Sequence, residues 1–220
     1  MSAGIGSGPR TVVLVSGSGT NLQAIIEQVV NGQLAVHLCA VVSDQPRAFG
    51  LERARRAGIP DFEVPYPGKE HRAQWHEALS ATLRTLQPDV VVLAGFMRIL
   101  PARLVERFEG HMLNVHPSLL PKYRGLDTYR RVLQAGDPWH GSTVHFVIPA
   151  LDAGPAIIQY RVPVSADDTE ATLANRVQRG EYIIYPRAIG WLAARQLRLV
   201  AGDVWLDGSR LDAPLIVEEE

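Results

Sequence analysis

Residues 11–26 read TVVLVSGSGTNLQAII, and this stretch decides the fold. Thr11–Val15 is a short run of β-branched and apolar residues, which is typical of a buried strand. From about Thr20 to Asn31 apolar residues recur every three or four positions, which predicts an amphipathic helix. The intervening loop, Ser16–Asn21, contains two glycines and small polar residues that allow a sharp turn. A strand, a tight loop and a helix in this order begin a strand–helix–strand unit.

The same rhythm continues to about residue 116. Strands are expected at Leu34–Val42, Phe62–Val64, Asp89–Ala94 and Met112–Val115, and helices at Phe49–Ala57, Lys69–Leu86 and Ala102–Phe108. The long strands are continuously apolar rather than alternating, as in a parallel sheet that helices cover on both faces. The sequence therefore predicts an α/β fold built on a doubly wound, mostly parallel, Rossmann-like sheet.

Beyond residue 116 the pattern changes. Ser142–Ile148 and Ala156–Val164 are apolar runs separated only by turn residues, so we expect neighbouring strands and an antiparallel C-terminal portion. A long helix is expected over about Glu170–Leu197, kinked or divided at Pro186, and a hairpin at Val204–Leu211.

No linker or internal repeat interrupts the chain, so one domain is expected over residues 11–211. Its first half would be residues 11–116, binding phosphate or nucleotide, and its second half residues 117–211. Residues 1–10 are expected to form a flexible tail, and residues 212–220 a C-terminal tail.

The composition describes a globular chain of 220 residues, 46% hydrophobic and 20% charged, with a net charge of −1. This balance argues against a protein that coats nucleic acid or an anionic membrane. Neither a secretory signal nor a run of 18 apolar residues is present, so a soluble, cytoplasmic protein is expected. The single cysteine, Cys39, excludes an intrachain disulfide, and no histidine spacing predicts a metal site.

The loop Ser16–Asn21 lies before a helix N-terminus, where free amides and the helix dipole favour an anion. It lacks the lysine of a P-loop. A dinucleotide-binding loop would have a third glycine where Leu22 stands, although Asp44 lies where a ribose-binding acid is expected. The remaining interpretations are a phosphate monoester site, with Thr20 and Asn21 as donors, and a plain tight turn.

A second group of polar residues follows the strand at 112–115. Asn114 and His116 are two positions apart, so they share one face of the strand near its carboxyl end, where open α/β sheets bind ligands. Asn114 offers an amide donor for an oxyanion, and His116 offers a proton near neutral pH. Asp152 is a candidate partner that would favour the charged imidazole. With no nucleophilic cysteine or serine evident, these residues suggest direct group transfer.

The run NVHPSLLP at 114–121 resembles the signature of the folate-dependent formyltransferases. SGSGTNLQ at 16–23, DVVVLAGFMRIL at 89–100 and LDAGP at 151–155 extend the resemblance over about residues 10–210. Together they are most similar to the members that formylate glycinamide ribonucleotide. Formyltransferases acting on methionyl-tRNA and formyltetrahydrofolate deformylases share the Asn-x-His-Pro signature, but they usually carry an extra domain for which this chain is expected to have no room.

The resemblance implies transfer of a formyl group from 10-formyltetrahydrofolate, a co-substrate, to the amine of glycinamide ribonucleotide in purine synthesis. It implies Asn114, His116 and Asp152 as the catalytic residues. The ribonucleotide would be bound by Gly19, Thr20, Asn21, Gln178, Arg179, Gly180 and Glu181. The folate would be bound by Arg72, Met97, Arg98, Ile99, Leu100, Asn114, Pro149, Ala150, Leu151 and Asp152.

Members of the family usually have histidine where Tyr129 stands, and we expect this residue at the rim of the site rather than in the chemistry. The expected partners are small molecules, not nucleic acid or membrane, for a monomer or weak homodimer. Three other functions stay open. They are hydrolysis of the formylfolate, a nicotinamide-dependent dehydrogenase, which Leu22 disfavours, and a ligand-binding module without catalysis.

Overall fold

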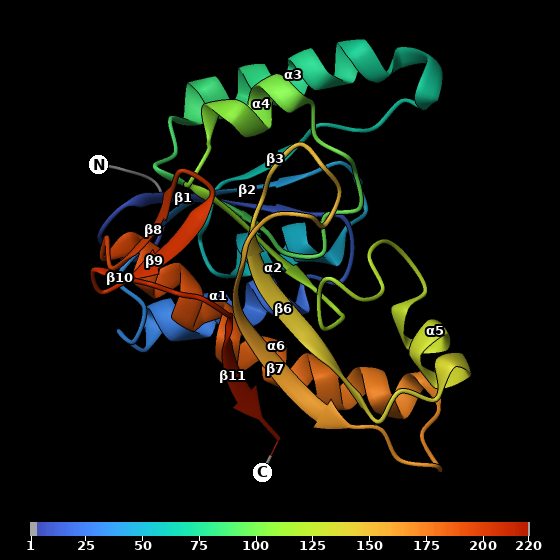
Figure 1. The fold of residues 1–220 in the computed structure, drawn as a ribbon. Helices are drawn as coiled ribbons and strands as arrows, with labels where there is room; N and C mark the ends of the chain where they lie inside the picture. The colour runs from blue at the N-terminus through green and yellow to red at the C-terminus, as the bar shows by residue number, and fades with distance from the viewer. Residues whose placement is uncertain (1–3, 220) are drawn as a thin grey trace. The chain divides into compact units, whose positions relative to one another are not determined.

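A computed structural model describes residues 4–219, and the chain divides into a first unit of residues 1–112 and a second unit of residues 113–220. Figure 1 shows the strands and helices of both units. We describe each unit separately. Among the described residues no helix is long and apolar enough to cross a membrane.

The first unit is a parallel sheet, as the sequence predicts, and its strand order is β4-β1-β2-β3. Its strands are β1 (Arg10–Val15), β2 (His37–Ser43), β3 (Asp61–Glu63) and β4 (Val90–Leu93). From β1 the sheet extends to β2 and β3 on one side, and the later strand β4 lies on the other side of β1. The carboxyl ends of β1 and β4 therefore form a topological switch point. Ligands of open α/β sheets bind at such an edge.

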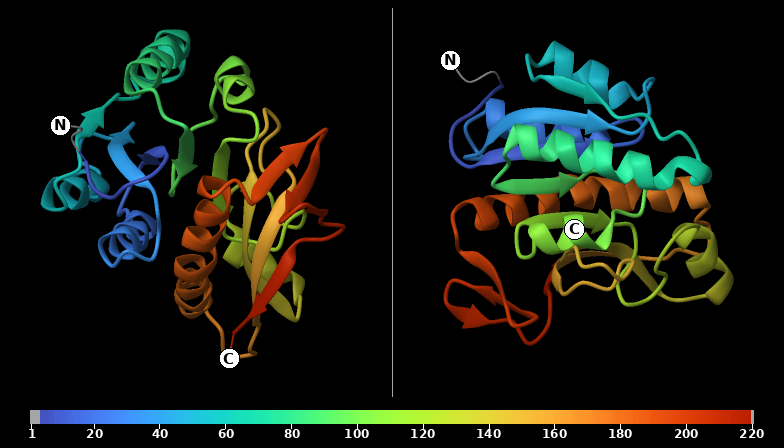
Figure 2. Two further views of the ribbon diagram at one scale, coloured as in Figure 1. Left: turned by 90° about the vertical axis from the view of Figure 1, so that its left-hand side faces the viewer. Right: turned by 90° about the horizontal axis from the view of Figure 1, so that it is seen from above.

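Helices cover both faces of this sheet, with α1 and α2 on one side and α3 and α4 on the other (Figures 1 and 2). They are α1 (Thr20–Val30), α2 (Phe49–Arg56), α3 (Arg72–Leu86) and α4 (Ala102–Arg107). Because both faces are covered, Val12–Val15 of β1 and Val90–Val92 of β4 are almost completely buried. Cys39 of β2 is also buried, and burial raises the pKa of its thiol.

Several boundaries in the first unit differ from the prediction. Leu34 and Val36 are buried but precede β2, because apolar side chains in a connecting segment can also enter the core. Residues 69–71 form a short 3-10 helix before α3. In the segment expected to be a flexible tail, Ile5 pairs with Leu38 of β2 in an isolated bridge, while residues 1–3 lie outside the described residues.

The second unit has β5 (Met112–His116), which begins at the unit boundary, and β6 (Trp139–Phe146) and β7 (Ala156–Pro163). These three strands are antiparallel neighbours, which confirms the expected antiparallel portion. The helix α6 (Glu170–Ala193) packs against β6 and β7. A Cβ atom added at Gly180 of α6 would lie 1.9 Å from the ring of Tyr160, so this contact requires glycine.

Two features of the helices differ from expectation. The helix α6 is continuous through Pro186, because Ile184, Tyr185 and Ile189 around it are buried and their packing offsets one missing hydrogen bond. The helix α5 (Thr128–Ala135) was not predicted, since only Thr128 and Val132 of its eight residues are buried. The expected hairpin is confirmed by β9 (Asp203–Leu206) and β10 (Ser209–Arg210), which extend β8 (Leu197–Val200).

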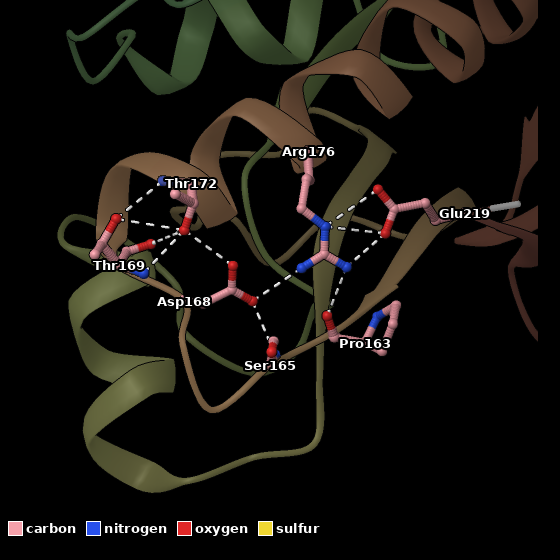
Figure 3. A network of polar contacts seen from close by, with 7 residues as sticks. All are labelled: Pro163, Ser165, Asp168, Thr169, Thr172, Arg176 and Glu219. Atoms are coloured by element: carbon pink, nitrogen blue, oxygen red, sulfur yellow. Dashed lines mark hydrogen bonds and ion pairs between the residues drawn. The ribbon is translucent and has the colours of Figure 1, made fainter.

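The expected C-terminal tail contains a strand, β11 (Leu215–Glu218), which pairs in parallel with β7. Arg176 of α6 holds the following residue in place, as Figure 3 shows. Its guanidinium donates five hydrogen bonds, to both carboxylate oxygens of Glu219, to Asp168 and to the carbonyl of Pro163. One arginine of α6 thus joins the C-terminal segment to the end of β7 and to the residues before α6.

A histidine lies in the core of the second unit. His140 of β6 is 1% exposed, and its ring lies against the backbone of Pro117. Tyr129 and Tyr123 contact it edge-on, with ring centroids 5.3 and 6.1 Å away. Burial, helped by the nearby charge of His116, lowers the pKa of His140 to about 4.

Replacing Arg176 with methionine keeps an unbranched stem and removes the five hydrogen bonds of the guanidinium. We expect the free energy of unfolding to fall by about 2 kcal/mol, since hydrogen bonds to charged groups contribute roughly 1.5–3 kcal/mol. Urea denaturation measures this change, and hydrogen exchange should become faster in residues 215–219. The control is Arg210→Met, which removes an exposed pair with Asp212. Equal effects of the two substitutions would contradict the role of Arg176 in holding the C-terminal segment.

Replacing His140 with leucine should flatten the acid side of the stability curve. Between pH 6.5 and about 4 the unfolded chain protonates this histidine and the folded chain does not, so stability falls as pH falls through that window. The slope is at most about 1.4 kcal/mol per pH unit. Urea unfolding at pH 7.5 and pH 5 measures it. His71→Leu, at an exposed histidine, is the control, and identical slopes in wild type and His140→Leu would refute the assignment.

Candidate active site

The catalytic residues expected from the sequence lie together in the second unit. Asn114 and His116 are on β5, and Asp152 is in the loop between β6 and β7. His116 Nδ1 lies 3.4 Å from Asp152 Oδ2, and both side chains are about nine-tenths buried. The same carboxylate oxygen accepts a hydrogen bond from the amide of Gly125, at 2.9 Å.

The other nitrogen of His116 is also committed. Nε2–H donates to the carbonyl of Tyr123, at 2.9 Å, so this nitrogen carries a proton. Nδ1 faces the Asp152 carboxylate, which can only accept when ionised. Both neighbours of the ring are therefore hydrogen-bond acceptors, the Tyr123 carbonyl on one side and the Asp152 carboxylate on the other. At 3.4 Å the contact with Asp152 is longer than a charge-assisted hydrogen bond, which leaves Nδ1–H able to reach another oxygen.

The Asn114 amide is oriented by a histidine that sequence reasoning missed. His145 of β6 lies directly opposite Asn114 in the strand register, and Asn114 Nδ2 is 3.1 Å from His145 Nε2. His145 Nδ1 is 2.8 Å from the carbonyl of Phe146 and must donate to it. Burial lowers the pKa of His145 to about 4, so near neutral pH the ring is uncharged and Nε2 accepts from Asn114. The second amide hydrogen of Asn114 remains available for a substrate.

The loop that carries Asp152 has an unusual backbone. Asp152 has φ 45°, in the left-handed region that favours glycine. A Cβ atom added at Gly154 would lie 1.8 Å from the carbonyl oxygen of Phe146, so the return of this loop onto β6 requires glycine. Strain of this kind collects at functional sites. Pro149, Ala150 and Leu151 lie in the same loop, and Leu151 is exposed.

The residues expected near the ribonucleotide in the second unit lie on α6. Gly180 packs on Tyr160, while Arg179 is exposed. Glu181 is buried. The pKa of Tyr129 is raised by the burial of its own side chain and by the charge of Glu181. Tyr129 therefore lies close to Glu181 and His140 rather than in the pair formed by His116 and Asp152.

In the first unit, the loop expected to bind phosphate follows β1 and leads into α1. Gly19 has φ 67°, in the left-handed region, and a Cβ atom there would lie 2.7 Å from Gly50 Cα. Both the backbone conformation and the close approach therefore require glycine at this position. The amide of Gly50 donates to the Gly17 carbonyl, and Arg53 Nε donates to the Ser18 carbonyl. Thus α2 holds the loop, with Thr20 and Asn21 in the first turn of an eleven-residue helix.

The residues expected to line the folate pocket follow β4. Met97 and Ile99 are 64% and 52% exposed, while Leu100 is buried. Arg98 Nε donates to Asp44 Oδ2, at 2.6 Å, so this side chain is held within the first unit. Arg72 begins α3 and donates to His76, at 3.3 Å, and His76 in turn contacts the backbone of Ile99.

Asp44 does not behave as a free ribose-binding acid. Its side chain has no exposed surface, and it accepts from Ser16, Gln45 and Arg98. The dehydrogenase alternative needs this carboxylate for a ligand, so the geometry counts against it. Among residues 4–219, no group of three histidine, cysteine, aspartate or glutamate side chains is placed to hold a metal ion.

Comparison with known proteins agrees with this arrangement. The chain is 48% identical over 200 residues to the phosphoribosylglycinamide formyltransferase of Escherichia coli strain K12, covering 91% of this chain and 94% of that protein. The solved structure of the enzyme of that name from Coxiella burnetii, in complex with CHES, has a TM-score of 0.89 at 43% identity and covers 96% and 99% of the two chains.

A formyltetrahydrofolate deformylase from Pseudomonas putida KT2440 is less similar, with a TM-score of 0.79 at 26% identity, and this chain covers 69% of its length. Residues 9–189 match the formyl transferase family, which is well over half of the chain. On the strength of that match and of the 48% identity over nearly the whole length, the chain belongs to the formyl transferase family.

Proposed function

We propose that this protein transfers the formyl group of 10-formyltetrahydrofolate to the amine of glycinamide ribonucleotide, a step of purine synthesis. The observation that carries the proposal is the pair of hydrogen-bond donors on β5, the Asn114 amide and the His116 ring, beside the Asp152 carboxylate. The names of the relatives that align over nearly the whole chain support the same reaction.

In the proposed reaction the uncharged amine of the ribonucleotide attacks the formyl carbon, and a new carbon–nitrogen bond forms. The carbonyl oxygen becomes an oxyanion, stabilised by the Asn114 amide and by protonated His116. Collapse of this tetrahedral intermediate breaks the bond to the folate nitrogen, which receives the proton that the amine loses. Formylated ribonucleotide and tetrahydrofolate leave, and no covalent enzyme intermediate is needed.

The role of Asp152 in this proposal is electrostatic and structural. Its carboxylate favours the imidazolium form of His116 and orients a water that carries the proton from the amine to the folate nitrogen. The carbonyl of Tyr123 holds the opposite nitrogen of the ring, so the Nδ1–H direction is set before substrate arrives. Preorganised donors of this kind each contribute roughly 3–4 kcal/mol to transition-state stabilisation.

The binding residues for the two substrates are proposed from the chemical groups that each substrate carries. We propose that Gly19, Thr20 and Asn21 hold the phosphate at the N-terminus of α1, and that Gln178–Glu181 bind the ribose and glycinamide. Arg72 would pair with the glutamate tail of the folate. Met97–Leu100 would line the pterin pocket largely through backbone groups, which the engagement of the Arg98 side chain with Asp44 supports. Pro149–Asp152 would also bind the folate. We expect a cytoplasmic monomer or weak homodimer.

A steady-state assay with 10-formyltetrahydrofolate, with and without glycinamide ribonucleotide, tests the proposal. Formylated product that depends on the ribonucleotide is expected, and tetrahydrofolate released without it would instead indicate hydrolysis. His116→Ala and Asp152→Ala should each lower kcat/KM by roughly 10²–10³-fold, since each weakens the oxyanion site.

The matched control for these variants is His71→Ala, at an exposed histidine of the first unit. Circular dichroism and urea unfolding confirm that each variant is folded. Normal turnover in both folded catalytic variants would show that the roles are assigned wrongly.

Replacing His145 with phenylalanine tests the orientation of Asn114. An aromatic ring is kept, but the acceptor for Asn114 Nδ2 and the donor to the Phe146 carbonyl are lost, so the amide is free to rotate. We expect kcat to fall by at least about tenfold, and the double variant with Asn114→Ala to be no slower than Asn114→Ala alone, because the two act as a unit. Additive losses would contradict the coupling.

A further inference from the structure

Asp44 follows β2 and is a buried carboxylate with three hydrogen-bond donors. Ser16 Oγ donates to Oδ1 at 2.5 Å, while Arg98 Nε and Gln45 Nε2 donate to Oδ2 at 2.6 and 3.1 Å. The side chain is 0% exposed. A buried charge is tolerated only when it is paired in this way, so the donors cannot leave without a large cost.

Two of these donors connect Asp44 to the loop that follows β4. Ser16 Oγ gives its hydrogen to Asp44 and accepts the amide hydrogen of Met97, at 2.8 Å, so the hydroxyl is a bridge between them. The Ser16 amide donates to the carbonyl of Gly95, at 3.2 Å. Arg98, held by Asp44, lies over the ring of Tyr66 with its guanidinium carbon 4.2 Å from the centroid.

The result is a loop with fixed backbone and exposed apolar side chains. Residues 97 and 98 are each tied to Asp44, directly or through Ser16, at the carboxyl ends of the strands. Met97 and Ile99 nevertheless project outward with more than half of their surface exposed. Small-molecule pockets combine apolar side chains with a few backbone groups in fixed positions, so a loop that lines such a pocket needs its backbone held.

We propose that Asp44 is a positioning residue that sets the backbone of residues 97–100 for the folate co-substrate. This inference rests on the proposed function. Asp44 acts through Ser16 and Arg98 and touches no reacting atom, so its loss should weaken folate binding without slowing the chemistry of the bound complex.

The test compares wild type with Asp44→Ala and Asp44→Asn, using the ribonucleotide-dependent assay. For Asp44→Ala we expect KM for 10-formyltetrahydrofolate to rise at least about tenfold, as for other supporting partners of a binding group. At saturating folate, kcat and KM for the ribonucleotide should stay within about twofold. Asp44→Asn keeps one acceptor oxygen for Ser16 and should give a smaller rise.

Hydrogen exchange followed by mass spectrometry gives a readout that does not depend on activity. Peptides covering residues 95–100 should exchange faster in Asp44→Ala. The acceptor of the Met97 amide is Ser16 Oγ, and this hydroxyl is no longer held in place by Asp44. Asp61→Asn is the matched control: it weakens another aspartate–arginine pair of the same unit, with Arg55 at 2.8 Å, at the start of β3 beside Val41 of β2. Neither readout should change there.

The outcomes are distinguishable. A raised folate KM with preserved kcat, faster exchange in residues 95–100 and partial rescue by Asp44→Asn supports the inference. Folded Asp44 variants that keep the wild-type folate KM overturn it, as does a fall in kcat with KM unchanged. If Asp44→Ala does not fold, the folate KM and exchange of Asp44→Asn decide. A wild-type chain that transfers no formyl group would instead contradict the proposed function, and this inference with it.

Discussion

The hydrogen bond from His145 to the carbonyl of Phe146 determines how the candidate catalytic centre is arranged. It places the single proton of a buried, neutral ring on Nδ1, and the opposite nitrogen is thereby an acceptor. The Asn114 amide turns its NH₂ group toward that acceptor. Without this bond the ring could carry its proton on Nε2, and Asn114 would have to present its oxygen instead. A donor for an oxyanion would then become a repelling group.

Asp44 and His116 follow the same physical rule in different ways. Water is excluded from both side chains, so protein groups must replace it. For Asp44 the replacements are three donors, and the anion becomes an anchor for a loop. For His116 they are two acceptors, which fix the direction of the ring. Both side chains are buried, and the partners that replace water determine whether each one holds a loop in place or is oriented toward a substrate.

The local sequence pattern was sufficient to predict the parallel sheet and the helices of the first unit, because each element is recognisable from its own short stretch of sequence. The apolar runs around β1 and β4 and the periodicity of α1 needed no partner to be recognised. Asn114, His116 and Asp152 stood out as polar residues at strand ends, and the structure brings them together. Their partner His145 did not, since its role depends on the register between β5 and β6. Likewise β11 is short and half exposed, and it pairs with residues almost sixty positions earlier.

The strand β11 has a consequence for how the second unit is made. It comes after every other element of that unit along the chain, yet it supplies the neighbour of β7, and Glu219 just beyond it completes the contacts of Arg176. During synthesis the first unit has all its strands by residue 112, whereas the second waits for residue 219. Until then the edge of β7 is unpaired and open to other strands. A nascent chain that ends before residue 215 therefore contains every strand of the first unit, while its second unit lacks the strand that pairs with β7.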